Sequence, residues 1–363
     1  MQKTLKFVTP GIALNTPTIS VLNAARLALP FWVNKRVYME ASFNEQPLNA
    51  RAISELHHQV PKSVTTQSGT AYKKTAPALL TVISTELLAE HLHTNVPVPY
   101  TEETRHIVLD LAGYDDIFYP PGYSVGIVPF DASLGDFNPK LFRLYSIASS
   151  LAQVEVSGKR TLSLCVTRVI GPHQEKPEEL FKGLCSNYAC DLKAGDSVRI
   201  TGPIGTSHYQ LPENAGAYNY IFIGNGTGIA PLRAMLQELD ATGQITPAQA
   251  IWVFFGFRKP EHFLKYQAEF AALQTQYPNV FYRAAISRPS DGTQKLFVQD
   301  ALWLENKHVA SLLPLNNTRI YLCGGKSMKD GVDEVLRKIG AEIEMDVTPL
   351  FEKHNQRYLT EVY

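Results

Sequence analysis

The sequence predicts two domains, an antiparallel β-barrel followed by an α/β domain with a parallel sheet. Between residues 76 and 213, short β-prone runs alternate with turn residues, which is typical of a small antiparallel barrel. From residue 214 to 363, strand-like runs alternate with helical patterns, which implies right-handed crossovers and a parallel sheet. Residues 1–75 differ from both and are interpreted as an extension of unknown role.

The length and composition fit this organisation. A chain of 363 residues has room for two domains, and 45% hydrophobic with 19% charged residues is typical of a folded protein. Lys+Arg and Asp+Glu both total 34, so the net charge gives no indication of a nucleic-acid partner. The longest apolar run, residues 19–33, is interrupted by Arg26 and Pro30 and is not expected to cross a membrane.

The four cysteines form no recognisable metal or disulfide pattern. Cys185 and Cys190 are the closest pair, but their spacing does not suit zinc, and no C-x-x-C occurs. Few cysteines in a long chain favour a reducing compartment, and we expect no metal site. The chain also lacks the cysteines for an iron–sulfur cluster of its own, so any electrons it moves must pass to another molecule.

The amino-terminal extension is poor in acidic residues, with none before Glu40. Apolar residues between 19 and 32 recur at helical spacing. Three interpretations stay open: a segment packed on the body, which we favour, a segment that docks on a membrane or partner, and a targeting sequence. Membrane association is expected only through this extension. A bacterial cytoplasm is favoured, with organelle import as the alternative, and residues 63–75 are predicted to be a linker.

In the barrel, turn residues at 120–122, 171–172 and 202–203 separate the expected strands. A helix is predicted to begin near Gly183, which offers backbone N–H groups to a phosphate. The expected strands are residues 79–83, 105–111, 124–128, 162–170 and 197–201.

In the α/β domain, strands are expected at residues 220–223, 251–255, 280–286 and 319–322, and helices at 231–239, 261–276 and 326–339. Ligands on such sheets bind beyond the carboxyl ends of the strands. Gly224, Gly226 and Gly228 follow the first strand there and predict a phosphate-binding turn. The dinucleotide fingerprint G-x-G-x-x-G itself is incomplete, because Ile229 occupies its last glycine position.

The barrel motif Arg143-Leu144-Tyr145-Ser146 combines a cation, an aromatic ring and a hydroxyl group. In a strand, Arg143 and Tyr145 share one face. An arginine can bind a pyrophosphate through paired hydrogen bonds, and a tyrosine can cover a flat ring. In isolation, such a motif is more often an ordinary strand with an exposed arginine.

Six motifs occur in a fixed order along the chain and together resemble the plant-type ferredoxin–NADP⁺ reductases over residues 76–363. They are Arg143-Leu144-Tyr145-Ser146, Cys165-Val166-Thr167, Gly183-Leu184-Cys185-Ser186, the run 226–231, Cys323-Gly324-Gly325 and Glu361-Val362-Tyr363. The last motif would be interpreted as a frayed tail only if the other motifs were ignored.

The resemblance implies that the barrel binds FAD. It assigns the FAD pyrophosphate to Arg143, stacking on the flavin to Tyr145, and a hydrogen bond near flavin N5 to Ser146. The other implied FAD contacts are Leu144, Cys165, Val166, Thr167, Gly183, Leu184, Cys185, Ser186, Thr227 and Tyr363.

The resemblance also implies NADP(H) in the second domain. It places Cys323 beside the nicotinamide, Glu361 at the hydride-transfer site, and Tyr363 over the flavin as a movable cover; with Ser146 these are the expected catalytic residues. An arginine beside a hydroxyl group, as in Ser287-Arg288, suits a 2′-phosphate. The implied NADP contacts are Thr227, Phe257, Arg258, Ser287, Arg288, Lys295, Phe297, Gln299, Gly324, Gly325 and Glu361.

Two positions depart from the family pattern. Gly171 stands where the family has a tyrosine that stacks on the FAD adenine. Two alternatives stay open: His173 substitutes for the tyrosine, or the adenine end of FAD is more mobile or bent. Thr167 replaces a lysine, which removes a positive charge from the expected partner side.

The resulting hypothesis is an FAD-dependent reductase that transfers electrons between NADP(H) and a one-electron carrier, ferredoxin or flavodoxin. One alternative is an NADPH-dependent reductase component that serves an oxygenase or a sulfite-reductase-like partner. Another, from a different class, is a non-catalytic flavin-binding docking protein. Retention of Ser146, Cys323, Glu361 and Tyr363 argues against the docking protein, which would not need them.

Overall fold

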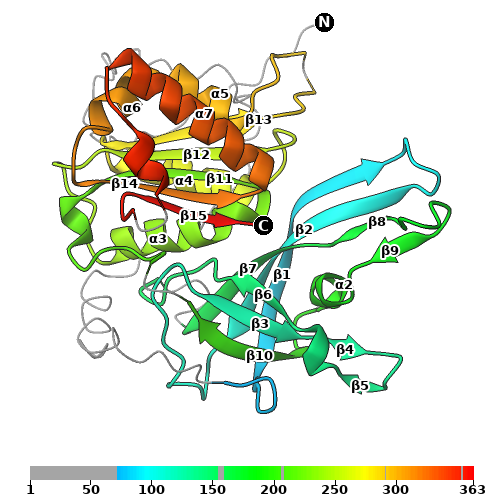
Figure 1. Ribbon diagram of the computed structural model, residues 1–363. Coiled ribbons are helices and arrows are strands. Elements are labelled where there is room, and N and C mark those ends of the chain that lie inside the picture. The colour runs from blue at the N-terminus through cyan, green and yellow to red at the C-terminus, as the bar shows by residue number, and fades with distance from the viewer. Residues whose placement is uncertain (1–71, 154–158, 206–207, 291, 353–354) are drawn as a thin grey trace, which may run out of the picture. The chain divides into compact units, whose positions relative to one another are not determined.

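The computed structural model describes residues 72–153, 159–205, 208–290, 292–352 and 355–363 (Figure 1). The predicted extension therefore lies outside the described residues, except for its last four. Of these, Tyr72 forms an antiparallel bridge with Gly202, so the described chain already contacts the barrel before residue 76. Across the described ranges, no helix is long and apolar enough to cross a membrane.

The described chain contains two larger sheets, one in the barrel region and one in the α/β region that follows it. The first region contains β1 Ala78–His93, β2 Tyr100–Asp110, β3 Ser124–Val128, β4 Phe130–Asp131, β5 Asp136–Phe137, η3 Pro139–Leu141, β6 Arg143–Ser146, β7 Thr161–Thr167, β8 Ile170–Pro172, β9 Leu180–Lys182, α2 Leu184–Asp191 and β10 Ser197–Ile204. The second contains η4 Ala215–Ala217, β11 Asn219–Asn225, η5 Gly226–Gly228, α3 Ile229–Ala241, β12 Ile251–Phe257, α4 Leu264–Gln276, β13 Val280–Ile286, α5 Val298–Leu304, α6 Asn306–Leu312, β14 Thr318–Gly324, α7 Lys326–Glu342, η6 Thr348–Phe351 and β15 Tyr358–Val362.

The first sheet is a nearly closed antiparallel barrel with the strand order β6-β3-β10-β1-β2-β7. Its two ends meet just after β6, where Ile147 bridges to Leu164 and the Ala148 N–H donates to the Ser163 carbonyl over 2.8 Å. Alternate side chains of these strands point inward and form one apolar core, to which α2 adds Cys185 and Ala189.

The β1–β2 hairpin is longer than the sequence indicated. The expected strand at residues 79–83 extends to His93, and its pairing with β2 continues from Thr81↔Asp110 to His93↔Tyr100. The added half, residues 84–93 and 100–104, is rich in polar side chains and therefore gave no hydrophobic signal. Leu88 of this half packs in the apolar core of the second region, together with Phe263 and Tyr266.

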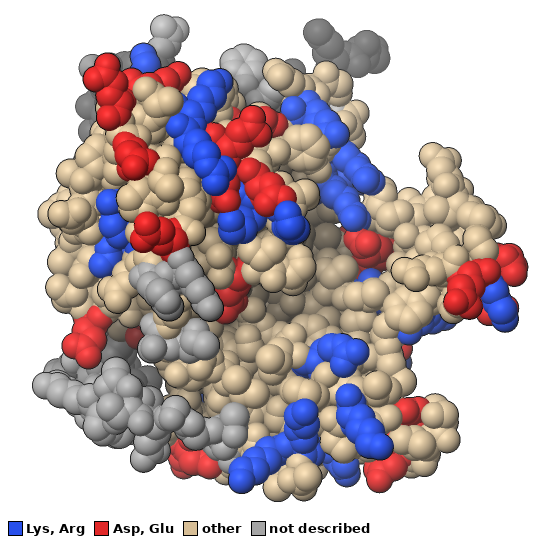
Figure 2. Space-filling view, in the orientation of Figure 1, with Lys and Arg blue, Asp and Glu red and all other residues tan. Residues whose placement is uncertain are grey.

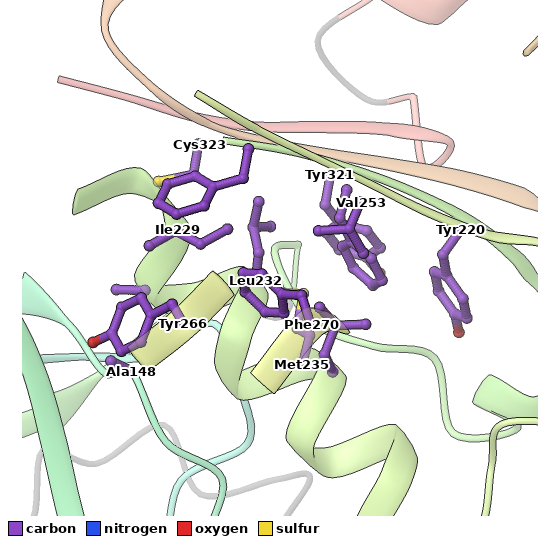
Figure 3. Close-up of a cluster of buried hydrophobic side chains, with 14 of the residues drawn as sticks. Ala148, Tyr220, Ile229, Leu232, Met235, Val253, Tyr266, Phe270, Tyr321 and Cys323 are labelled. Atoms are coloured by element: carbon purple, nitrogen blue, oxygen red, sulfur yellow. The ribbon is translucent and has the colours of Figure 1, made fainter. Parts of the chain in front are cut away.

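The second sheet is parallel, in the order β13-β12-β11-β14-β15, as the alternating pattern predicted. Its central strands are buried on both faces and read as continuous apolar runs. Helices α3 and α4 cover one face and α5, α6 and α7 the other (Figure 1). Figure 3 shows part of the first of these layers, where Leu232 and Met235 of α3 pack with Phe270 of α4.

Most expected elements are present, with differences at their ends. Helix α4 begins at Leu264, three residues after the expected 261, because Phe263 before it adopts a left-handed conformation with φ 56°. The short helices α5 and α6 and the strand β15 were not expected. The frayed-tail interpretation of Glu361-Val362-Tyr363 is wrong, because β15 pairs with β14 from Ile320↔Tyr358 to Gly324↔Val362.

The glycine turn depends on close packing against β14. A Cβ atom on Gly228 would lie 2.1 Å from the carbonyl oxygen of Cys323, whereas one on Gly171 would have Tyr100 Oη at 3.7 Å as its nearest neighbour. Gly228 has ordinary helical dihedral angles, so only packing requires a glycine here. The first turn of α3 is thereby held against the end of β14.

We expect Gly228→Ala to lower the free energy of unfolding by about 1–3 kcal/mol, because the backbone of β14 must move to admit the methyl group. Gly171→Ala is the matched control and should change stability by less than about 0.5 kcal/mol. Urea unfolding of the two variants and the wild type measures both values. Equal stability of the two variants would contradict the packing argument.

Candidate active site

A cavity of about 1080 Å³ is lined by residues from both sheets. It lies beside the carboxyl ends of the parallel strands, where the fold predicts a ligand. A smaller cavity of about 540 Å³ reaches from the barrel strand β6 to the start of α2. Leu144, Tyr145, Thr167 and Val169 line both, so the two cavities share a wall. Figure 2 shows a hollow on this face with Lys and Arg side chains on either side.

Strand β6 presents the barrel motif to these cavities. Arg143 and Leu144 are exposed, while Tyr145 and Ser146 are half-buried. Arg143 and Tyr145 line the smaller cavity, and Leu144, Tyr145 and Ser146 line the larger one. Burial raises the pKa of Tyr145, so its phenol stays neutral. The exposed guanidinium beside a half-buried ring fits a ligand with both charge and a flat surface.

Strand β7 alternates between the cavity and the barrel core. Cys165 and Thr167 line the larger cavity. Val166 lies between them in sequence, is fully buried and belongs to the barrel core. Its side chain lines neither cavity, because neighbouring residues of a strand point to opposite faces. Any contact of Val166 with a ligand would have to involve its backbone.

The start of α2 forms a tight backbone turn at the end of the smaller cavity. Gly183 is the N-cap residue, and Gly183, Leu184, Cys185 and Ser186 all line the cavity. The Ser186 hydroxyl accepts from the Val169 N–H over 3.0 Å and donates to the Gly183 carbonyl over 3.1 Å. A Cβ on Gly183 would approach both Ser186 Oγ and Val169 Cβ to 3.0 Å. The N-cap residue makes no side-chain hydrogen bond to the first N–H groups of α2, which leaves these donors available to a phosphate.

Tyr363 lies in the larger cavity with its hydroxyl group anchored on the glycine turn. Its Oη lies 3.1 Å from Thr227 Oγ1 and donates to the Asn225 carbonyl over 3.3 Å, and its backbone N–H donates to the Gly324 carbonyl over 3.2 Å. The residue is nevertheless 67% exposed. An aromatic ring fixed at one edge and exposed over much of its surface fits stacking on a flat ring.

Three polar groups from different strands gather in the larger cavity: Ser146 of β6, Cys323 of β14 and Glu361 of β15. Cys323 and Glu361 are direct neighbours across the β14–β15 pair. Burial raises the pKa of Glu361 to about 7, and a hydrogen bond with Ser146 opposes the rise. Burial, and then the nearby Glu361, raises the pKa of Cys323, which keeps the thiol protonated. A carboxyl group that titrates near neutrality can exchange a proton with a ligand.

The chain is similar to proteins of known function. A family model described as the oxidoreductase NAD-binding domain matches residues 222–334. The ferredoxin–NADP reductase of Spirulina sp is 36% identical over 251 residues, which are 68% of this chain and 83% of the relative. The chain belongs to the ferredoxin–NADP reductase family. The chloroplastic embryo isozyme of Oryza sativa subsp. japonica is 34% identical over 80% of this chain and 76% of its own length.

The structural comparison agrees with this family. A ferredoxin–NADP⁺ reductase from Plasmodium falciparum superposes with a TM-score of 0.59 at 25% identity, over 81% of this chain and 98% of that one. Members of the family are oxidoreductases that use FAD and NADP(H). The α2 turn, the exposed Arg143 and the anchored Tyr363 ring all fit FAD.

Four of the site residues expected from the sequence do not line either cavity: Val166, Arg288, Lys295 and Gly324. Arg288 lies beside the larger cavity, where it hydrogen bonds with His91. Lys295 lies 4.4 Å above the ring of Phe297, which does line the cavity. A Cβ on Gly324 would lie 2.1 Å from Asn225 Oδ1, so close packing explains this glycine.

His173, the proposed substitute for an adenine-stacking ring, lines neither cavity. Its Nδ1 accepts from the Glu175 N–H over 3.2 Å in the turn between β8 and β9. Phe181 is paired directly opposite Gly171, is 51% exposed and lines the smaller cavity. Cross-strand pairing is the signal that could have identified Phe181, since opposite residues share one face of a ladder.

Sequence reasoning also missed Asn225, His91 and Glu102, all of which line the larger cavity. Asn225 directly precedes the glycine turn, and its side-chain oxygen accepts from the Gly325 N–H over 3.4 Å. Its position at the end of a predicted strand was an available signal. His91 and Glu102 lie on the polar half of the β1–β2 hairpin, which was not expected.

The raised pKa of Glu361 predicts how stability depends on pH. The folded chain holds this proton up to about pH 7, whereas the ordinary value is 4.5. The stabilising effect of the proton is thus complete below about pH 4.5 and is lost as the pH rises through 7. Glu361→Gln cannot ionise, so its stability relative to wild type should increase between about pH 5 and pH 8.

Urea unfolding of both proteins at the two pH values measures this difference. Glu342→Gln, which removes an exposed carboxylate at the end of α7, serves as the control. If Glu361→Gln and wild type lose stability in parallel over this range, the carboxyl group of Glu361 does not titrate near neutrality.

Proposed function

We propose that residues 76–213 form an FAD-binding domain and residues 214–363 an NADP(H)-binding domain of a reductase that exchanges electrons with a one-electron carrier. The observation that carries the proposal is that Ser146, Cys323 and Glu361 line one cavity together with the anchored ring of Tyr363. When bound, FAD supplies a flavin that takes up two electrons as a hydride and releases them singly.

The smaller cavity is the proposed site for the FAD phosphates. Arg143 would form charge-assisted hydrogen bonds from one side, and the N–H groups of Leu184, Cys185 and Ser186 would bind from the other. Tyr145 would orient the flavin ring of FAD and Tyr363 would cover it. The two aromatic side chains would also exclude water from the flavin. Leu144, Cys165, Thr167 and Thr227 line the same space.

Glu361 and Ser146 are the proposed proton-handling groups. The carboxyl group titrates near neutrality, so it can hold a proton in one step and release it in the next. The Ser146 hydroxyl is its hydrogen-bond partner on the barrel side of the cavity. Cys323, which stays neutral, would pack against the nicotinamide without adding a charge.

The remainder of the larger cavity is the proposed NADP(H) site. The turn at Gly226–Gly228 and the start of α3 would bind the pyrophosphate. Ser287, Arg288 and Lys295 would bind the 2′-phosphate, and Phe297 would stack on the adenine. Phe257, Arg258, Gln299 and Gly325, which also line the larger cavity, are the other proposed contacts.

The proposed carrier is ferredoxin, with flavodoxin as a second acceptor. Lys140, Arg143 and Lys182 are exposed beside or on the smaller cavity, and Figure 2 shows Lys and Arg gathered over the barrel. A positive surface there would attract an acidic carrier to the flavin. Four free, buried cysteines fit a reducing compartment, and we propose the bacterial cytoplasm.

The function is tested with the purified full-length chain. It should bind FAD, turn yellow, and reduce added ferredoxin and flavodoxin with NADPH as the electron donor. Failure to take up FAD on reconstitution, or no turnover with NADPH and any acceptor, would contradict the proposal. Turnover with a dye but with neither carrier would instead favour a reductase component for an oxygenase or sulfite-reductase-like partner.

The position of Tyr363 gives a separate prediction. Nicotinamide must displace this ring to reach the flavin, so Tyr363→Ser should strengthen NADP⁺ binding by about tenfold, the effect of one aromatic stack. Tyr363→Phe keeps the ring but loses the bonds to Thr227 and Asn225, and should change affinity less. Difference spectra of the bound flavin measure both. Unchanged affinity in Tyr363→Ser would show that the ring does not block the nicotinamide.

A further inference from the structure

The polar half of the β1–β2 hairpin lies against the loops that follow β12 and β13. The Phe263 N–H donates to the Leu88 carbonyl over 2.5 Å, and His262 Nε2 lies 2.9 Å from the Glu90 carbonyl. Glu90, His91 and Glu102 of the hairpin line the larger cavity. The barrel strands therefore contribute side chains to the region proposed for the nucleotide.

Arg258 and Arg288 are neighbours in this region. They follow the paired strand ends Phe257↔Ile286, and the Arg288 N–H donates to the Arg258 carbonyl over 2.7 Å. Both guanidinium groups lower the pKa of His91 by electrostatic repulsion of its protonated form. Burial is the largest cause of the lowered pKa, followed by Arg258, His93 and Arg288. Two positive charges thus lie at one edge of the cavity.

Each arginine is held by the hairpin. Arg258 Nη1 donates to the Glu102 carboxylate in an ion pair whose side chains are 35% and 25% exposed. Arg288 Nη1 lies 2.6 Å from His91 Nε2. Because an arginine can only donate, His91 Nε2 must accept, which requires the neutral ring that the lowered pKa favours.

The neutral His91 then carries its proton on Nδ1. This atom is covered, and no hydrogen-bond partner for it exists within the described part of the chain. The edge of the cavity thus holds the Arg258 guanidinium and the Ser287 hydroxyl, with Arg288 beside them and with Glu90 and Glu102 on the hairpin side. The guanidinium groups and the hydroxyl are groups that bind a phosphate, whereas a carboxylate is not.

We propose that Glu102 is a specificity-determining residue that competes with the 2′-phosphate of the nucleotide for Arg258. The inference rests on the proposed NADP(H) site. A phosphate dianion can replace the carboxylate on Arg258, whereas a ribose hydroxyl cannot and leaves the ion pair closed. Glu102 therefore lowers the affinity for 2′-phosphorylated nucleotides without affecting those that lack this group.

The experiment uses the FAD-loaded protein and titration calorimetry with 2′-phospho-AMP and, separately, 5′-AMP. Glu102→Gln should bind 2′-phospho-AMP about fivefold more tightly than wild type, the effect of removing one partly exposed ion pair, with 5′-AMP unchanged. Glu86→Gln is the matched control: it lies on the same hairpin, pairs with Lys265 over 3.5 Å and does not line the cavity.

A second background separates competition for Arg258 from general repulsion. In Arg258→Ala, the further change Glu102→Gln should have no effect beyond that of Glu86→Gln. An equal gain in both backgrounds would overturn the proposal, as would unchanged or weaker binding of 2′-phospho-AMP in Glu102→Gln alone.

The wild type distinguishes this proposal from the function it rests on. Wild type could bind 2′-phospho-AMP more tightly than 5′-AMP while Glu102→Gln has the same affinity for 2′-phospho-AMP as wild type. In that case only the proposed competition is wrong. If wild type shows no preference for the 2′-phosphate, the NADP(H) site itself is wrong.

Discussion

A buried arginine connects the two halves of the active site. Arg233 lies in α3, one turn after the glycines, and its side chain is only 3% exposed. Its Nη1 donates to the carbonyl oxygen of Ala148, two residues after Ser146, and its other donors bind the Glu269 carboxylate of α4. Its guanidinium also lies 4.8 Å from the ring of Tyr266. This one side chain fixes the glycine turn to the end of β6. Removing it would leave Glu269 without its ion partner and the Ala148 carbonyl without this donor.

The site combines this rigid frame with neutral polar groups. Desolvation raises the pKa of Tyr145 and of Cys323, so both stay protonated, and it raises the pKa of the Glu361 carboxyl group to about 7. Positive charge is confined to the edges, at Arg143 on one side and Arg258 with Arg288 on the other. An arrangement of this kind suits a ligand with an uncharged reacting ring at the centre and phosphates at its ends.

The fold was largely predictable from the sequence because both periodicities were strong. The continuous apolar runs of β11 and β12 indicated a parallel sheet, and β3 and β13 were expected with their observed ends. The site motifs were predictable because they depend on short local runs. Phe181 was missed because its relevance comes from pairing across a ladder, and Asn225 because its hydrogen bond joins residues 100 positions apart, although its place at a strand end was a signal. The polar half of β1–β2 gave no signal, since its side chains alternate between solvent and another part of the protein rather than a barrel core. Arg288 was expected at the nucleotide, but its contact with His91 of that same hairpin was not expected.

The hairpin also affects how this reductase can be divided or recombined. Leu88 belongs by sequence to the barrel, but packs with Phe263 and Tyr266 of the other half. A cut at residues 213–214 would therefore expose an apolar surface on both fragments and leave the Phe263 N–H unpaired. A chimera that transplants only residues 214–363 onto a foreign barrel would inherit half of a shared core. A chimera that keeps this core intact must transfer residues 84–105 together with residues 214–363. The two segments are separated by more than a hundred residues in sequence.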